Sequence, residues 1–288
     1  RVGSELSCDE AYRGHLIENE LSSCNRRSEV YERIRNCRII VGTVAAISGK
    51  PELFRLKHFD VAIIDEATQI LEPQLLGILC ARGEDGKDAI DKFVLIGDHK
   101  QLPAVVQQNT EQSAIYDESL LSIGLTNLKD SLFERLYRNC TATVHRSYDM
   151  LCRQGRMHPE VALFANRAFY GGRLIPVGLP HQIESSDTIC RLAFYPSVPE
   201  KVGASAKINY SEARIVADLA VRIYEDHQAD FDESRTLGII TPYRSQIALI
   251  KKEIESLGIP ALNRILVDTV ERFQGSERDV IIYSFCVN

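Results

Sequence analysis

Hydrophobic positions follow two periods along the chain, one typical of buried strands and the other of amphipathic helices. Short apolar runs predict buried strands at 61–64, 93–96, 237–241, 265–268 and 279–285. Between them, apolar residues recur three and four positions apart, most clearly over 211–227 and 245–257, which predicts helices. Strands alternating with helices are joined by right-handed crossovers, so the pattern predicts an α/β protein with mainly parallel sheets.

Less regular segments predict further elements. A helix is expected over 71–80, where Pro73 is tolerated in the first turn. Another should follow residue 159, and residues 104–142 should be mostly helical. The apolar residues expected on one side of the helix after 159 are Val161, Phe164, Ala165 and Phe169. Short strands are expected at 38–41, 141–145 and 191–195.

The length of 288 residues predicts about two domains, which we place at 1–147 and 148–288. The first begins with a loosely helical segment and without a methionine, so we expect a piece of a longer protein.

Composition narrows the class of protein. With 44% hydrophobic and 26% charged residues, the chain can bury a core in each half. No apolar run approaches the ~18 residues that span a bilayer, so no membrane partner is expected. The net charge of −6 gives no global basic field, and any nucleic-acid binding must come from local patches. Eight scattered cysteines without a CxxC pair favour reduced thiols, hence an intracellular protein, cytoplasmic or nuclear, or in a bacterial cytoplasm.

Two carboxylates follow the apolar run at 61–64. Asp65 and Glu66 stand where that strand should end, and in open α/β sheets ligands bind at the carboxyl ends of strands. We therefore assign Asp65 to a Mg²⁺ ion and Glu66 to the attacking water. The alternative is an ordinary strand followed by a helix-capping acid.

A second polar cluster, GDHKQLP, occupies 97–103 after the run at 93–96. The amide of Gln101 can donate a hydrogen bond to a γ-phosphate. One such stretch alone is compatible with a turn. Two polar clusters about 30 residues apart, each after a predicted strand, favour a site.

The glycine-rich stretch at 42–51 does not match a phosphate-binding loop. Such a loop needs G-x-x-x-x-G-K-[ST], but Gly42 and Gly49 enclose six residues and Pro51 follows Lys50. Thr43 is expected either to cap the next helix or to touch a nucleic-acid phosphate.

In the second half, Arg156 precedes the predicted helix after residue 159. A loop arginine there can point into an interdomain cleft. The alternative is a surface arginine.

Six ordered motifs carry a family resemblance across nearly the whole chain. They are DEAT (65–68), GDHKQLP (97–103), SLFERL (131–136), QGRMHP (154–159), GIITPYRSQ (238–246) and VDTVERFQGSERDVII (267–282). With them the sequence resembles superfamily 1 helicases of the 5′-to-3′ branch, in the group of the nonsense-mediated-decay helicase, senataxin and the Dna-two nuclease-helicase. The resemblance implies two RecA-like domains, the first truncated at its N-terminus, with ATP and Mg²⁺ in the cleft between them.

The resemblance also gives each matching position a role. Asp65 would hold Mg²⁺ and Glu66 would activate water. Gln101 and Arg156 would contact the γ-phosphate, which makes Glu66, Gln101 and Arg156 the expected catalytic residues. Glu277 would contact the ribose.

Further positions match the family's coupling and strand-binding residues. Gln274 and Gly275 would help couple the nucleotide cleft to nucleic acid. Hydroxyls and main-chain amides can hold phosphates without a basic field. The positions expected near the backbone of single-stranded DNA or RNA are Thr43, Pro242, Tyr243 and Thr269. Tyr243 has the alternative of simple packing.

The departures from the family pattern also matter. Gly155 stands where the family has a tyrosine that can stack on adenine. The Walker A loop is absent from these residues, and the last arginine-finger motif would start beyond Asn288. We therefore expect the core of an ATP-dependent translocase or helicase whose activity needs more than this stretch. The alternative is a non-catalytic scaffold or nucleic-acid-binding module on a degenerate helicase fold.

Overall fold

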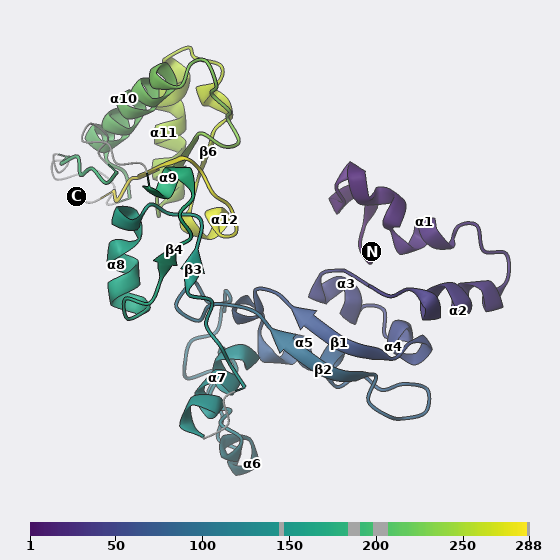
Figure 1. Cartoon of the computed structure of the whole chain (residues 1–288). Helices are drawn as coiled ribbons and strands as arrows, with labels where there is room; N and C mark the ends of the chain where they lie inside the picture. Colours follow the sequence, from purple (N-terminus) through teal and green to yellow (C-terminus); the bar gives the residue numbers. More distant parts are fainter. Residues whose placement is uncertain (144–146, 184–190, 198–206, 287–288) are drawn as a thin grey trace. The chain divides into compact units, whose positions relative to one another are not determined.

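The computed structural model describes residues 1–143, 147–183, 191–197 and 207–286 (Figure 1). Contacts divide the chain into two compact units, Arg1–Cys152 and Arg153–Asn288, each of which is described by itself. From the sequence, the domain boundary was expected after residue 147. No helix in the described residues is both long and apolar enough to cross a membrane.

The first unit begins with short helices and then forms a small parallel sheet. The N-terminal segment contains η1 (Glu5–Ser7), η2 (Glu10–His15), α1 (Ile17–Leu21), α2 (Arg27–Asn36), α3 (Val44–Ser48) and α4 (Glu52–Leu56). The remaining elements are β1 (Phe59–Ile64), η3 (Ala67–Gln69), α5 (Glu72–Leu79), β2 (Ile90–Leu95), α6 (Glu118–Ser122) and α7 (Leu132–Ala142). The expected helix over 71–80 is confirmed by α5, with its proline in the first turn.

Strands β1 and β2 pair in parallel, with Ile64 opposite Leu95. On the inner side of this sheet, Ile64 packs with Leu75 of α5 and Leu132 of α7. The expectation that this strand is fully buried is wrong, because the side chain of Ile63 is 68% exposed. Val61, two positions before Ile63 and on the same face of β1, is also exposed, so little of the described chain covers that face.

Three sequence expectations in this unit need correction. Residues 38–41 form no strand, and the nearest bridge, between Val2 and Gly42, lies just after them. Strand β2 begins at Ile90, three residues before the run expected at 93–96. Residues 104–117 are not helical, because Asn109 and Gln112 exchange side-chain and backbone hydrogen bonds that compete with a helix.

The expectation of a strand at 141–145 is also wrong for the residues that the structure describes. Residues 141 and 142 lie in α7, and residues 144 and 145 lie outside the described part of the chain.

The second unit is built on a three-stranded parallel sheet in the order β6-β5-β7. Its strands are β3 (Arg153–Gln154), β4 (Ile175–Pro176), β5 (Leu237–Ile240), β6 (Leu266–Asp268) and β7 (Val280–Tyr283). Its helices are α8 (Pro159–Phe169), α9 (Pro180–Ile183), α10 (Tyr210–Asp226), α11 (Arg244–Ser256), η4 (Leu262–Arg264) and α12 (Val270–Phe273). The main strands and helices expected from the hydrophobic pattern are confirmed here.

The central strand β5 is buried as predicted. Leu237 and Ile239 are fully buried and pack with Ile250 of α11, while α10 lies beside α11 (Figure 1). Gly238 is needed at this place, because a Cβ atom there would lie 2.5 Å from Cε1 of Phe273. The tight approach fixes α12 against the sheet.

The strand expected at 191–195 is wrong. Leu192 and Phe194 are exposed, and neither residue joins a sheet of the described chain. Apolar residue types alone do not make a strand when no neighbouring strand accepts the backbone hydrogen bonds.

Candidate functional site

The carboxyl ends of β1 and β2 bring the two polar clusters of the first unit together. The amide of Ile96 donates to the carbonyl of Ile64 at 2.8 Å, and the amide of Ala67 donates to the carbonyl of Ile96 at 2.8 Å. A Cβ atom at Gly97 would lie 3.0 to 3.1 Å from three atoms of the buried Thr68. The DEAT and GDHKQLP motifs therefore lie side by side, and glycine permits the close approach.

Glu66 adopts a strained backbone conformation at this edge. Its φ of 51° lies in the left-handed region, which non-glycine residues occupy rarely. Oδ1 of Asp65 accepts from the amide of Glu66 at 3.0 Å, and Oε2 of Glu66 accepts from Nε2 of Gln69 at 2.7 Å. Although Glu66 precedes η3, its carboxylate does not cap that helix. Both acids stay exposed at the surface.

Gln101 is held within the GDHKQLP turn by Asp98. Nε2 of Gln101 donates to Oδ2 of Asp98 at 3.0 Å, and the amide of Lys100 donates to Oδ1 of the same carboxylate at 2.9 Å. The neighbouring His99 ring packs on Tyr137 of α7 with centroids 4.5 Å apart. Burial lowers the pKa of His99 below its ordinary value, and the charge of Lys100 adds to the shift.

A buried ion pair beneath this edge was not foreseen from the sequence. Nε of Arg135 donates to Oε2 of Glu72 at 2.8 Å, and Nη2 of the same guanidinium reaches Oε1. Nη1 of Arg135 donates to the carbonyl of Ile123 at 3.0 Å. Glu72 is only 4% and Arg135 only 9% exposed. The pair joins α5, just after DEAT, to α7 in the SLFERL motif. The two residues stand 63 positions apart, so no local pattern connects them.

In the second unit, Arg156 and Glu277 lie together although 121 positions separate them. Nε of Arg156 and Oε2 of Glu277 are 2.8 Å apart, and both side chains are well exposed. The sequence analysis expected these residues to contact the γ-phosphate and the ribose. The structure joins them directly to each other.

The loop that carries Arg156 is held by two glutamines. Oε1 of Gln154 accepts from the amides of Arg156 at 3.1 Å and Met157 at 2.8 Å. The buried Gln182 donates to the carbonyls of Gln154 at 3.0 Å and Met157 at 3.1 Å. Sequence reasoning missed Gln182, which supports the loop from α9. At Gly155, a Cβ atom would lie 3.3 Å from Cδ1 of Leu179.

The predicted strand-binding residues of the second unit follow β5 and β6. The amide of Thr241 donates to the carbonyl of Asp268 at 3.2 Å, which ties the two loops together. Tyr243 stands at the N-terminus of α11, and the ammonium of Lys207 lies 6.0 Å from its ring centroid. The Thr269 side chain hydrogen-bonds Glu271 and lowers the pKa of that carboxyl.

Three further predicted residues occupy defined places. Oγ1 of Thr43 accepts from the amide of Ala46 at 3.2 Å, so Thr43 caps α3. Helix capping was one of the two roles expected for this residue. Gln274 and Gly275 follow α12, where Gly275 takes a φ of 78° that suits glycine. The stretch between Gly42 and Gly49 therefore contains a short capped helix.

Two protein-family models, both described as AAA domain, match residues 15–109 and 128–288. The second covers more than half of the chain. Among curated proteins, the chain is 30% identical to the DNA replication ATP-dependent helicase/nuclease DNA2 of Xenopus laevis over 88% of its length. It is 31% identical to the probable helicase MAGATAMA 3 of Arabidopsis thaliana over 86%, and 29% identical to the probable helicase senataxin of Mus musculus over 80%. The matches cover 24%, 29% and 8% of those proteins, so the chain spans about a quarter of the DNA2 relative.

Proposed function

Because the chain belongs to the AAA-domain helicases of the DNA2 and senataxin group in superfamily 1, we propose that it forms the core of an ATP-driven translocase or helicase on single-stranded DNA or RNA. The observation that carries this proposal is the hydrogen bond from Ala67 to Ile96, which sets the DEAT and GDHKQLP motifs at one edge of a parallel sheet. Such edges are where α/β proteins bind ligands. We infer an intracellular location from the same family.

The donor set at this edge fits a hard cation. Asp65 presents an exposed carboxylate whose Oδ2 has no hydrogen-bond partner among the described residues, and oxygen is the donor that Mg²⁺ prefers. Asp65 would hold the ion. When bound with ATP, Mg²⁺ neutralises charge on the phosphates.

Glu66 is proposed as the general base that takes a proton from the attacking water. The left-handed backbone turns its carboxylate away from a capping position, and Gln69 holds one oxygen, which leaves the other for a water. Gln101 donates to the γ-phosphate in this proposal. To do so its amide must leave Asp98, so that contact is a resting position.

The second unit contributes Arg156 and Glu277. The guanidinium of Arg156 stabilises negative charge on the γ-phosphate, and Glu277 accepts from the ribose hydroxyls. Because the two side chains are paired in the structure and both are exposed, solvent screens their contact and a nucleotide can separate them at small cost. Gln274 and Gly275 link this part of the site to the strand-binding residues, and Glu277 follows Gly275 by two positions.

The proposed strand path uses Thr43 in the first unit and three residues of the second. Hydroxyl and amide donors at the ends of β5 and β6 suit phosphate oxygens, independent of base sequence. The donors proposed here are Tyr243 and Thr269, and Pro242, which has no N–H, would contact the strand by packing.

Nucleic-acid-stimulated ATP hydrolysis tests the proposal. The natural protein that carries this chain should hydrolyse ATP faster when single-stranded DNA or RNA is added, and the Arg156→Ala variant should lose that turnover. A non-catalytic scaffold would bind nucleic acid with no ATP hydrolysis above background.

A further inference from the structure

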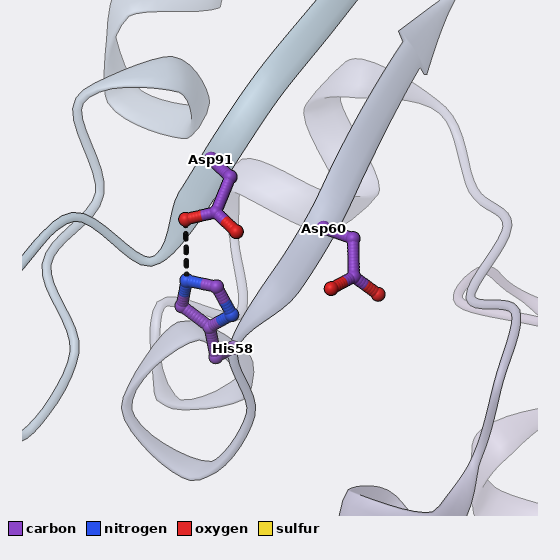
Figure 2. A group of neighbouring side chains, drawn as sticks. All are labelled: His58, Asp60 and Asp91. Atoms are coloured by element: carbon purple, nitrogen blue, oxygen red, sulfur yellow. Dashed lines mark hydrogen bonds and ion pairs between the residues drawn. The ribbon is translucent and has the colours of Figure 1, made fainter.

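A second group of polar side chains lies at the opposite end of the sheet from Asp65. His58 precedes β1, Asp60 lies near the start of β1, and Asp91 lies near the start of β2. One ligand atom from each residue lies within 4.8 Å of the other two. Figure 2 shows the His58 ring below Asp91, with Asp60 to one side on the neighbouring strand. We call these three residues the amino-edge cluster.

The strand register explains why the two acids meet. Phe59 pairs with Ile90 and Val61 with Lys92, so Asp60 and Asp91 stand beside each other on neighbouring strands. Like charges across paired strands are destabilising. Nε2 of His58 lies 3.0 Å from Oδ1 of Asp91, whereas the Asp60 carboxylate has no ion pair or hydrogen bond in the described part of the chain (Figure 2). The Asp60 carboxylate therefore stands beside a second carboxylate without a partner of its own among the described residues, and a cation bound here would neutralise it.

We propose that the amino-edge cluster binds a divalent transition-metal ion, with Zn²⁺ as the reference, through one imidazole nitrogen and two carboxylate oxygens. Imidazole ligands favour zinc, copper, iron and nickel, whereas Mg²⁺ and Ca²⁺ favour oxygen alone. Around a tetrahedral zinc, ligand atoms stand about 3.4 Å apart, given metal–ligand distances near 2.0–2.1 Å. The three side chains are exposed, so small rotamer changes close the remaining gap.

The surroundings leave the ion accessible. A cavity of about 860 Å³ borders the amino-edge cluster and is lined by His58 and Asp91 together with Arg55, Lys57 and Arg82. Three protein ligands leave a coordination position open to a water or to an anion. The cavity supplies the entry path that a metal site requires.

This site is separate from the proposed nucleotide site. Asp60 lies in β1 and Asp65 directly follows the last residue of that strand, so the two are five residues apart, about 17 Å at 3.3–3.4 Å per residue. The bound ion would link the first residues of β1 to those of β2 and so stabilise the first unit. The inference does not depend on ATP hydrolysis.

Titration of the 288-residue chain with Co²⁺ and then Zn²⁺, in a buffer without chelators, tests the proposal. We expect one equivalent of Co²⁺ with weak visible absorption bands, displaced by Zn²⁺ and not by excess Mg²⁺. Cysteine thiolates would instead give a strong near-ultraviolet band, which separates binding by the free cysteines from binding by the amino-edge cluster.

Three variants locate the ion. His58→Ala, Asp60→Asn and Asp91→Asn should each weaken binding by more than the roughly 10–100-fold that loss of an outer-shell partner costs. His227→Ala is the matched control, because His227 faces Asp230 at 3.7 Å on the surface of the second unit without a third ligand. It should bind the ion like the parent chain.

Thermal unfolding with and without Zn²⁺ separates loss of the metal site from a change in the stability of the fold. Zn²⁺ should raise the melting temperature of the parent chain and leave that of Asp60→Asn unchanged. Without metal, Asp60→Asn should be at least as stable as the parent, because it removes a like charge. The proposal is overturned if no ion binds, or if the three variants bind it as tightly as His227→Ala does.

Discussion

The buried pair between Glu72 and Arg135 gives the sharpest prediction of stability. Arg135→Ala leaves a carboxylate that is 4% exposed without its bidentate partner. Breaking a buried pair in this way costs about 3–5 kcal/mol, because the remaining charge stays desolvated. Loss of the hydrogen bond to the carbonyl of Ile123 adds about 1 kcal/mol. The first unit should therefore lose about 4–6 kcal/mol of its free energy of unfolding.

A matched control separates burial from charge. Arg82 pairs with Asp88 at 2.7 Å in the same unit, but the two side chains are 62% and 63% exposed. Arg82→Ala should cost at most about 1 kcal/mol, as exposed pairs do. Replacing both buried partners, as in Glu72→Leu with Arg135→Met, should recover most of the loss, because no charge is then left alone.

Hydrogen exchange read by mass spectrometry is the assay, because it reports opening free energies segment by segment. In Arg135→Ala, peptides from α5 and α7 should exchange faster while those from α10 and α11 keep their protection. If Arg135→Ala changes exchange no more than Arg82→Ala does, the pair is not a buried link between the two helices and the reasoning fails.

Three further predictions test separate parts of the account. Gly238→Ala should destabilise the second unit by about 1–3 kcal/mol or more, since overpacking forces Phe273 to move, and denaturant unfolding will measure it. Burial lowers the pKa of His99 in the folded state. The contribution of neutral His99 to stability is therefore full above the unfolded-state pKa of about 6.5 and is lost as the pH falls from there through the lowered folded-state pKa. His99→Phe should flatten that part of a pH–stability profile. These 288 residues should bind Mg·ATP only in the millimolar range or weaker. The two phosphate contacts, from Gln101 and Arg156, contribute roughly 1.5–3 kcal/mol each, which barely offsets an association cost of at least about 4 kcal/mol. Micromolar binding in calorimetry would contradict this.

The hydrophobic pattern predicted most strands and helices of the second unit because each of those elements has its own strong period. β5 reads as a buried run, and the apolar positions of α10 and α11 recur at helical spacing. The same reasoning overestimated the burial of β1, because burial depends on what covers the strand. It also wrongly predicted strands at 38–41 and 191–195, where the apolar residues have no neighbouring strand in the described chain.

Motif order selected the candidate site residues, whereas their partners could not be read from the sequence. Glu277 was placed by the FQGSERDVII motif, yet its contact with Arg156 spans 121 positions. Gln182 carries no motif at all, and its role is visible only through the two carbonyls that it binds. The amino-edge cluster depended on the register between β1 and β2, although the alternation of His58 and Asp60 was a signal in the sequence.

Single-turnover ATP hydrolysis by the Glu66→Gln variant tests the central claim most directly. An amide cannot take a proton from water, so the variant of the natural protein that carries this chain should bind ATP and single-stranded nucleic acid like the parent while its hydrolysis rate falls by roughly 10²–10⁴-fold. Asp88→Asn, at an exposed carboxylate of the same unit outside the proposed site, serves as the control and should hydrolyse ATP like the parent. A Glu66→Gln variant that hydrolyses ATP at the parental rate would contradict the proposed site.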